Sequence, residues 1–224
     1  MSGVMPSGLH PCASTTTRCC VVRHGETDWN VERRVQGHVD IPLNGKGRSQ
    51  AATVARRLAG ECFSAVYSSD LQRAWQTAEP TAKLHKLPIR LDPALRERNF
   101  GVLQSLTADE ARTRYPEASL GRAERDPDYA FEGGESLVAF EKRSRDCLSE
   151  MARRHAGETI LVVTHGGVLD IAYRQAMGRA LGSRRDFALP NAGINWLEAC
   201  ADGWRVLLWA DLSHFDRALD ELSA

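Results

Sequence analysis

Two stretches of the chain end in the same way: Cys19–Val22 (CCVV) runs into Arg23-His24-Gly25, and Thr159–Thr164 (TILVVT) runs into His165-Gly166-Gly167. Short apolar runs without a polar face are typical of strands that are buried on both sides, as in parallel sheets. Ligands bind beyond the carboxyl ends of the strands in such sheets. We therefore expect the two histidines to meet at one end of a sheet.

Helical and strand patterns alternate around these two runs. Apolar residues recur at helical spacing over 45–59, 71–84 and 136–154, and a further helix is expected to follow His165 and to end near Gly178. Strands are predicted at 64–68 and 89–91, and a hairpin at the sheet edge from Ile194–Leu197 and Trp204–Trp209. This alternation predicts an α/β fold, a three-layer sandwich with a mostly parallel central sheet.

One segment interrupts the alternation. Residues 97–135 have little periodicity and contain one predicted short helix, which begins at the capping-box pattern Thr107–Glu110. We predict that this segment is an inserted cap over a pocket. No Gly/Ser-rich linker divides residues 19–224, which we expect to form a single domain, and residues 1–18, small, polar and broken by prolines, are expected to be a disordered leader.

Composition excludes several classes of function. The 224 residues carry 29 basic and 29 acidic side chains, so no long-range field is expected to attract nucleic acid or an anionic membrane. No run approaches the roughly 20 apolar residues of a membrane span, and a cytoplasmic location is expected. The six cysteines are scattered, and neither CxxC nor HExxH occurs, so reduced thiols and no bound metal are expected.

The residues around the first histidine suit chemistry on phosphate. A neutral imidazole has a lone pair that can attack phosphorus, and an adjacent arginine, Arg23, would disfavour protonation of the His24 ring. Arginine presents a planar fork that matches phosphate oxygens, so Arg73, at the start of a predicted helix, is a candidate partner. Either histidine alone could be structural, and Arg73 alone could be a solvated helix residue.

The motifs taken together resemble the histidine phosphatase superfamily, the group named after cofactor-dependent phosphoglycerate mutase. The resemblance extends over nearly all of the chain after residue 18, and five motifs in the order typical of the family carry it. They are Arg23–Asn30 (RHGETDWN) with Gln36–Leu43, Ser68–Ala74 with Thr77-Ala78, Leu95–Gly101, Gly133–Ser136 and Thr164–Gly167.

This resemblance implies a role for each matched residue. His24 would become phosphorylated in a pocket formed by Arg23, Arg73 and His165, and Glu97 would be the general acid. Asn30 would donate to the phosphoryl oxygens, and the other substrate-binding residues would be Gln36, Gly37 and Gly166. No metal or cofactor is implied, because the arginines supply the positive charge.

Two activities and a third class remain open from the sequence. Family mutases carry a lysine and an arginine pair after the glutamate motif, and Arg112, Arg114, Arg122 and Arg125 do not reproduce that pattern. The resemblance therefore favours a phosphatase that acts on a small phosphorylated metabolite, with a cofactor-dependent mutase as the alternative and a non-catalytic phosphate-binding scaffold as a remote third. The tandem Arg184-Arg185 beside Asp186 does not form a nucleic-acid patch.

Overall fold

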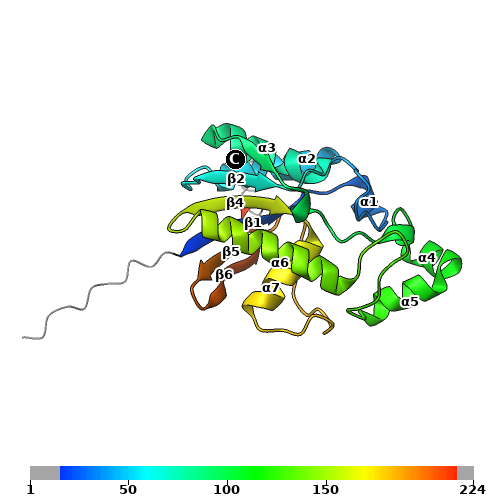
Figure 1. The fold of residues 1–224 in the computed structure, drawn as a ribbon. Coiled ribbons are helices and arrows are strands. Elements are labelled where there is room, and N and C mark those ends of the chain that lie inside the picture. The colour runs from blue at the N-terminus through cyan, green and yellow to red at the C-terminus, as the bar shows by residue number, and fades with distance from the viewer. Residues whose placement is uncertain (1–15, 216–224) are drawn as a thin grey trace, which may run out of the picture.

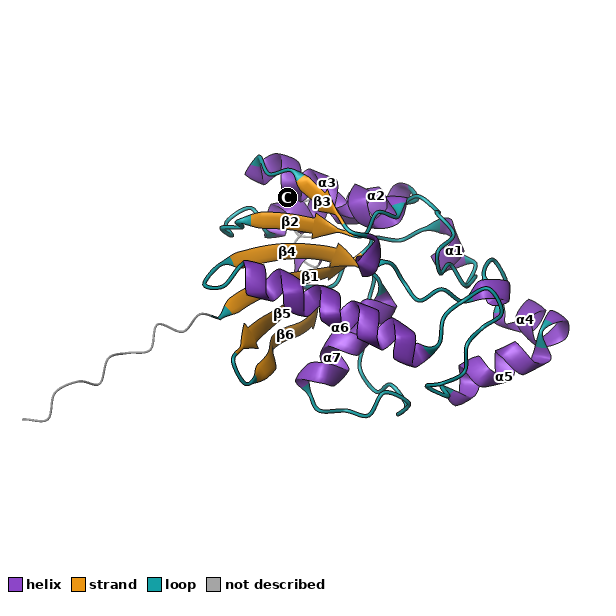
Figure 2. Cartoon of the chain, in the orientation of Figure 1, coloured by secondary structure: helices purple, strands orange, loops and turns teal. Residues whose placement is uncertain are grey.

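A computed structural model describes residues 16–215 of the chain. Its six-stranded sheet has the order β3-β2-β4-β1-β5-β6 (Figures 1 and 2). The first four strands in this order are mutually parallel, and β5 and β6 form an antiparallel hairpin at one edge. The strands are β1 (Thr17–Arg23), β2 (Ala65–Ser68), β3 (Ile89–Leu91), β4 (Thr159–Thr164), β5 (Ile194–Cys200) and β6 (Gly203–Asp211).

Helices cover both faces of the sheet. On one face, α2 (Gly45–Arg57) and α3 (Gln72–His85) pack against Cys20 and Val22 of β1, and on the other, α6 (Leu137–Arg154) and α7 (Gly166–Ala176) pack against Cys19 and Val21. Alternate residues of β1 thus point into two separate cores, as expected for a strand buried on both sides. The predicted α/β fold with a mostly parallel central sheet is confirmed.

The pairing of β1 with β4 positions the two histidines. The strands are adjacent and parallel, and Arg23 is in register with Thr164, so both strands end at the same level. The backbone N–H of His24 donates to the carbonyl of Thr164 at 2.8 Å. The two predicted His-Gly segments therefore leave the sheet side by side.

The segment between β3 and α6 contains more helix than we predicted. The capping box formed by Thr107 and Glu110 opens α4 (Ala108–Arg114), and a second helix that the sequence reading missed, α5 (Pro116–Glu124), follows at once. Two 3-10 turns precede them, η1 (Pro93–Leu95) and η2 (Gly101–Leu103). A small apolar cluster that includes Leu103, Leu106 and Phe131 packs this segment together, and α4 and α5 lie beside the carboxyl ends of the parallel strands (Figure 2).

Two further boundaries differ from the predictions. Strand β1 begins at Thr17, whose buried hydroxyl donates to the carbonyl of Ala152 at 2.7 Å, so residues 17 and 18 belong to the sheet. The rest of the predicted leader, residues 1–15, lies outside the described residues. A one-turn helix, α1 (Asp28–Val31), follows β1 where no helix was predicted.

Candidate active site

His24 follows β1 and is almost completely buried. Its Nδ1 lies 2.8 Å from the carbonyl oxygen of Gly25, which can only accept, so Nδ1 carries the proton in the neutral ring. The lone pair is then on Nε2, and the ring borders a cavity. Burial and the charges of Arg73 and Arg23 hold the pKa of His24 well below its usual value, which keeps the ring neutral and nucleophilic.

His165 and Arg73 form a bonded unit behind His24. Arg73 is 1% exposed, and its Nε donates to Nδ1 of His165 at 3.3 Å. His165 Nε2 therefore carries the proton and donates to Ser69 Oγ at 2.9 Å, and burial, followed by the charge of Arg73, lowers its pKa well below the usual value. The rings of His24 and His165 have centroids 5.1 Å apart, so the predicted meeting of the two histidines is observed.

The guanidinium of Arg73 is fixed on its remaining sides by backbone. Its Nη atoms donate to the carbonyls of Val39 at 2.8 Å and Gly37 at 2.7 Å, and burial lowers its pKa to about 10, so it stays charged at neutral pH. Gly37 has a φ of +54°, and a Cβ there would lie 2.1 Å from Oε1 of Gln104. The positive φ and the close side chain of Gln104 favour a glycine where the loop reaches Arg73.

Arg23 lies beside His24 with part of its guanidinium unused. It donates from Nη1 to the carbonyl of Leu189, whereas its buried Nε has no partner among the described residues. Burial lowers the pKa of Arg23, and the charge of Glu97 opposes this shift. We name Arg23, His24, Arg73 and His165 the floor of the site.

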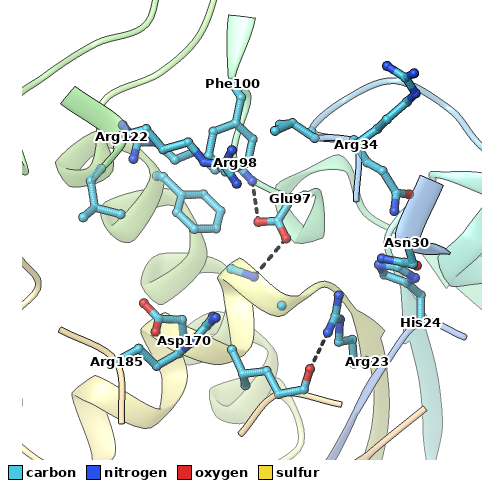
Figure 3. Close-up of a pocket in the computed structure, with 18 of the residues that line it drawn as sticks. Arg23, His24, Asn30, Arg34, Glu97, Arg98, Phe100, Arg122, Asp170 and Arg185 are labelled. Carbon is cyan, nitrogen blue, oxygen red and sulfur yellow. Dashed lines mark hydrogen bonds between the residues drawn. The ribbon is translucent and has the colours of Figure 1, made fainter. Parts of the chain in front are cut away.

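Glu97, the first residue of the cap segment, lies close to the start of α7 (Figure 3). Its Oε2 accepts from the backbone N–H of Gly167 at 2.9 Å and its Oε1 from that of Arg98 at 2.8 Å. A Cβ on Gly167 would lie 1.9 Å from Oε1, so the second glycine after His165 makes room for this carboxylate. Two backbone N–H groups thus hold the carboxyl group of Glu97 near the floor.

Asn30 and Gln36 complete the set of predicted residues at the cavity wall. Asn30 Oδ1 accepts from the N–H of Thr27 at 3.1 Å and from Nδ2 of Asn191 at 3.3 Å. Asn191 also donates to the carbonyl of His24 at 3.0 Å, a role that the sequence reading missed. The buried Oε1 of Gln36 has no partner among the described residues.

These side chains surround a cavity of about 390 Å³. Among the predicted site residues, His165 alone does not border it, because that ring lies behind Arg73 and His24. Further arginines that the sequence reading did not assign to the site line the rest of the cavity, among them Arg34, Arg98, Arg122, Arg125 and Arg185. We call Arg122, Arg125 and Arg185 the rim.

The rim arginines come from two segments far apart in the chain. Arg122 lies on α5 and Arg125 directly after it, and Arg185 lies in the loop between α7 and β5. Arg125 donates to Asp170 Oδ2 of α7 at 3.0 Å, which joins the cap segment to the sandwich. In the sequence, the only sign that Arg122 and Arg125 belong to the site is that basic residues occur in a segment without periodicity. This sign does not distinguish them from Arg112 and Arg114.

Known proteins resemble this chain over most of its length. The profile of the histidine phosphatase superfamily (branch 1) matches residues 19–212. The chain is 42% identical over 200 residues to phosphoglycerate mutase-like protein 4 of Arabidopsis thaliana, covering 88% of this chain and 86% of the relative. It is 39% identical over 204 residues to a metal-independent phosphoserine phosphatase of the same plant, covering 90% and 84%.

A solved structure shows the same fold. YhfR of Bacillus stearothermophilus superimposes with a TM-score of 0.83 at 34% identity, covering 88% of this chain and 98% of that one. No helix in the described range 16–215 is long and apolar enough to cross a membrane. The matched profile, the two plant relatives and the shared fold establish that the chain belongs to the histidine phosphatase superfamily.

Proposed function

We propose that the chain is a metal-independent phosphomonoester hydrolase that acts through a phosphohistidine at His24 on a small phosphorylated metabolite. The observation that carries the proposal is the state of the His24 ring: neutral, with Nδ1 held by the Gly25 carbonyl and Nε2 toward a cavity that Arg23 and Arg73 border. Family relationship to a phosphoserine phosphatase supports hydrolysis.

The first half-reaction transfers the phosphoryl group to His24. The Nε2 lone pair attacks phosphorus, the ester P–O bond breaks, and the leaving oxygen takes a proton from Glu97, which enters this step as the carboxylic acid. The Gly25 carbonyl stabilises the positive ring that results, because Nδ1 keeps its proton. Arg23 and Arg73 meet the charge on the equatorial oxygens in a buried site, where fixed donors are most effective.

In the second half-reaction, water attacks phosphorus and the P–N electron pair returns to Nε2. Glu97, now a carboxylate, takes a proton from the water, and inorganic phosphate leaves. Each residue therefore ends in its starting state. His165 acts on this cycle through Arg73, whose Nε it holds.

Trapping of the phosphoenzyme tests the proposal. Intact-mass analysis of rapidly quenched enzyme should show one added phosphoryl group that is labile in acid and stable in base, as a P–N bond is. His24→Ala should show none. Equal labelling of the two proteins would contradict the assignment of His24.

Turnover should also survive EDTA. The guanidinium groups of Arg23 and Arg73 supply the charge that a metal ion would otherwise provide. In the described range 16–215, no group of three or more His, Cys, Asp or Glu side chains could hold a metal ion. Loss of turnover with EDTA that magnesium or zinc restores would contradict metal independence.

A phosphoglycerate mutase is the second candidate, and the rim supports it. The resemblance implies that mutases hold a substrate carboxylate with basic residues after the glutamate motif, and Arg122 and Arg125 border the cavity from that segment. If the dephosphorylated intermediate stays bound, the phosphoryl group can return from His24 to that molecule. If the intermediate leaves, water can enter and hydrolyse the phosphohistidine. We expect slow or no interconversion of 3- and 2-phosphoglycerate, no large stimulation by 2,3-bisphosphoglycerate, and release of inorganic phosphate from monoesters. Rapid bisphosphoglycerate-dependent interconversion would favour the mutase.

A further inference from the structure

The loop between α7 and β5 is held at its beginning by a buried arginine. Arg174 of α7 is 3% exposed and forms an ion pair with Asp170 at 2.9 Å. Its Nη1 donates to the carbonyl of Ala180 and to Oγ of Ser183, both at 2.6 Å, and its Nη2 to the carbonyl of Ser183 at 2.9 Å. A buried guanidinium whose donors bind consecutive parts of one loop fixes the path of that loop.

The other end of the loop is held by aromatic side chains. The Phe187 ring stacks on Tyr173 of α7 with centroids 4.0 Å apart, and Trp209 Nε1 donates to the carbonyl of Ala188 at 3.0 Å. The carbonyl of Leu189 then accepts from Arg23 at the floor. Residues 184–186 form a short arch between two anchored positions, Ser183 and Phe187.

Neighbouring side chains of the arch have different surroundings. Asp186 pairs with Arg179, and Arg184 is exposed and does not border the cavity. Arg185 borders the cavity on the side away from His24 and Asn30 in Figure 3, and it makes no hydrogen bond or ion pair with any residue that the structure describes. Arg185 and Arg23 border the same cavity, and the charge of Arg185 contributes to the lowering of the Arg23 pKa after the larger effect of burial.

We propose that the arch presents Arg185 as a receptor for a second anionic group on the substrate, a carboxylate or a second phosphate, while the floor holds the phosphoryl group. The proposal rests on the proposed function and specifies its substrate class: small phosphomonoesters with a second negative charge. A guanidinium fork on a braced loop matches such a group, because it makes no ion pair with a described carboxylate, and Asp170 of the same cavity is paired with Arg125 and Arg174 instead.

The first test uses two substrates that differ in one group. 3-Phosphoglycerate carries a carboxylate where glycerol 3-phosphate carries a hydroxymethyl group. We expect the wild-type enzyme to favour 3-phosphoglycerate in kcat/KM by about tenfold or more, as a charge-assisted pair would give. Arg185→Gln should reduce this ratio to near one, whereas Arg184→Gln, the adjacent arginine that faces solvent, should keep it.

A second pair distinguishes the two anions. Propane-1,3-diol bisphosphate and 3-hydroxypropyl phosphate differ only in the second phosphate. Preference confined to 3-phosphoglycerate would assign a carboxylate site, preference confined to the bisphosphate would assign a phosphate site, and preference in both pairs would assign a general anion site. Loss of each observed preference in Arg185→Gln supports the proposal.

Calorimetric binding to the His24→Ala protein makes the test independent of turnover. We expect the anionic member of at least one pair to bind more tightly, and the added Arg185→Gln change to remove the difference. Equal affinities within both pairs, or the same loss with Arg184→Gln, would overturn the proposal. Failure of the proposed function would be seen separately, as the absence of phosphohistidine and of phosphate release while the binding difference remains.

Discussion

The floor and the rim of the cavity use the same side chain in different ways. At the floor, Arg73 is 1% exposed and bonded to His165, Val39 and Gly37, so its position is fixed by the sheet end and its loops. At the rim, Arg185 is exposed and unpaired among the described residues, and its backbone alone is braced. A fixed donor can stabilise a transition state, whereas a free one selects among ligands. Changes at Arg73 should thus affect every substrate, and changes at Arg185 should affect substrate choice.

The largest expected effect is that of His24→Ala. Without the nucleophile, the covalent route is closed, and kcat should fall on the order of 10⁴-fold or more on every phosphomonoester. Initial rates with 3-phosphoglycerate, glycerol 3-phosphate and p-nitrophenyl phosphate provide the measurement. A loss that depended on the second anion would mean that the floor and the rim are not separate in function.

Arg73→Lys should follow, with a loss on the order of 10² to 10³-fold in kcat. Lysine keeps the charge but has one ammonium group in place of a fork, so it cannot bond His165 Nδ1 and the carbonyls of Val39 and Gly37 in the same geometry. Lys at this position would also leave buried acceptors unsatisfied, so thermal unfolding should be measured beside the rates. Near-wild-type kcat would show that charge alone suffices at the floor.

Three of the four floor residues could be placed from the sequence because they lie at two strand ends. Arg23 ends β1, His24 and His165 directly follow β1 and β4, and the register of these two parallel strands brings the residues together. The rim could not be predicted in this way. Arg185 depends on contacts of Phe187 with Tyr173 and of Ala188 with Trp209, which join three separate elements and leave no local pattern.

The cap segment shows the same limit. The helix α4 was predictable because Thr107 and Glu110 form a local capping box. The helix α5 has no side-chain N-cap bond, starts after Tyr115 at Pro116, and buries only Ala118. Its stability comes from tertiary packing in the cluster around Leu103 and Phe131, which a search for periodicity does not detect.

Glu97→Gln should cost on the order of 100-fold with an alkyl phosphate such as glycerol 3-phosphate. Its loss should be smaller with p-nitrophenyl phosphate, because that leaving group hardly needs a proton. The ratio of the two losses in steady-state kcat is the measurement. Equal losses would assign Glu97 a binding role, in keeping with its bonds to the N–H groups of Gly167 and Arg98, and would leave the general acid unidentified.

The smallest expected effect is a difference in acid stability. Burial holds the pKa of His24 well below its unfolded value of about 6.5, so the unfolded chain takes up a proton that the folded chain refuses. A lowered folded pKa means that the free energy of unfolding is highest above pH 6.5 and falls as the pH decreases. The decrease in the free energy of unfolding that comes from His24 should reach about 2 kcal/mol by pH 5.

Denaturant unfolding of wild type and His24→Asn at pH 8 and pH 5 would measure this contribution, since asparagine keeps an N–H donor near the Gly25 carbonyl without titrating. The variant should lose about 2 kcal/mol less between the two pH values than wild type does. Arg185→Gln should behave as wild type, because arginine stays protonated in both states over this range. If the two variants showed the same pH dependence, the neutral, desolvated state of His24 would be wrong, and with it the physical basis for nucleophilic attack from the floor.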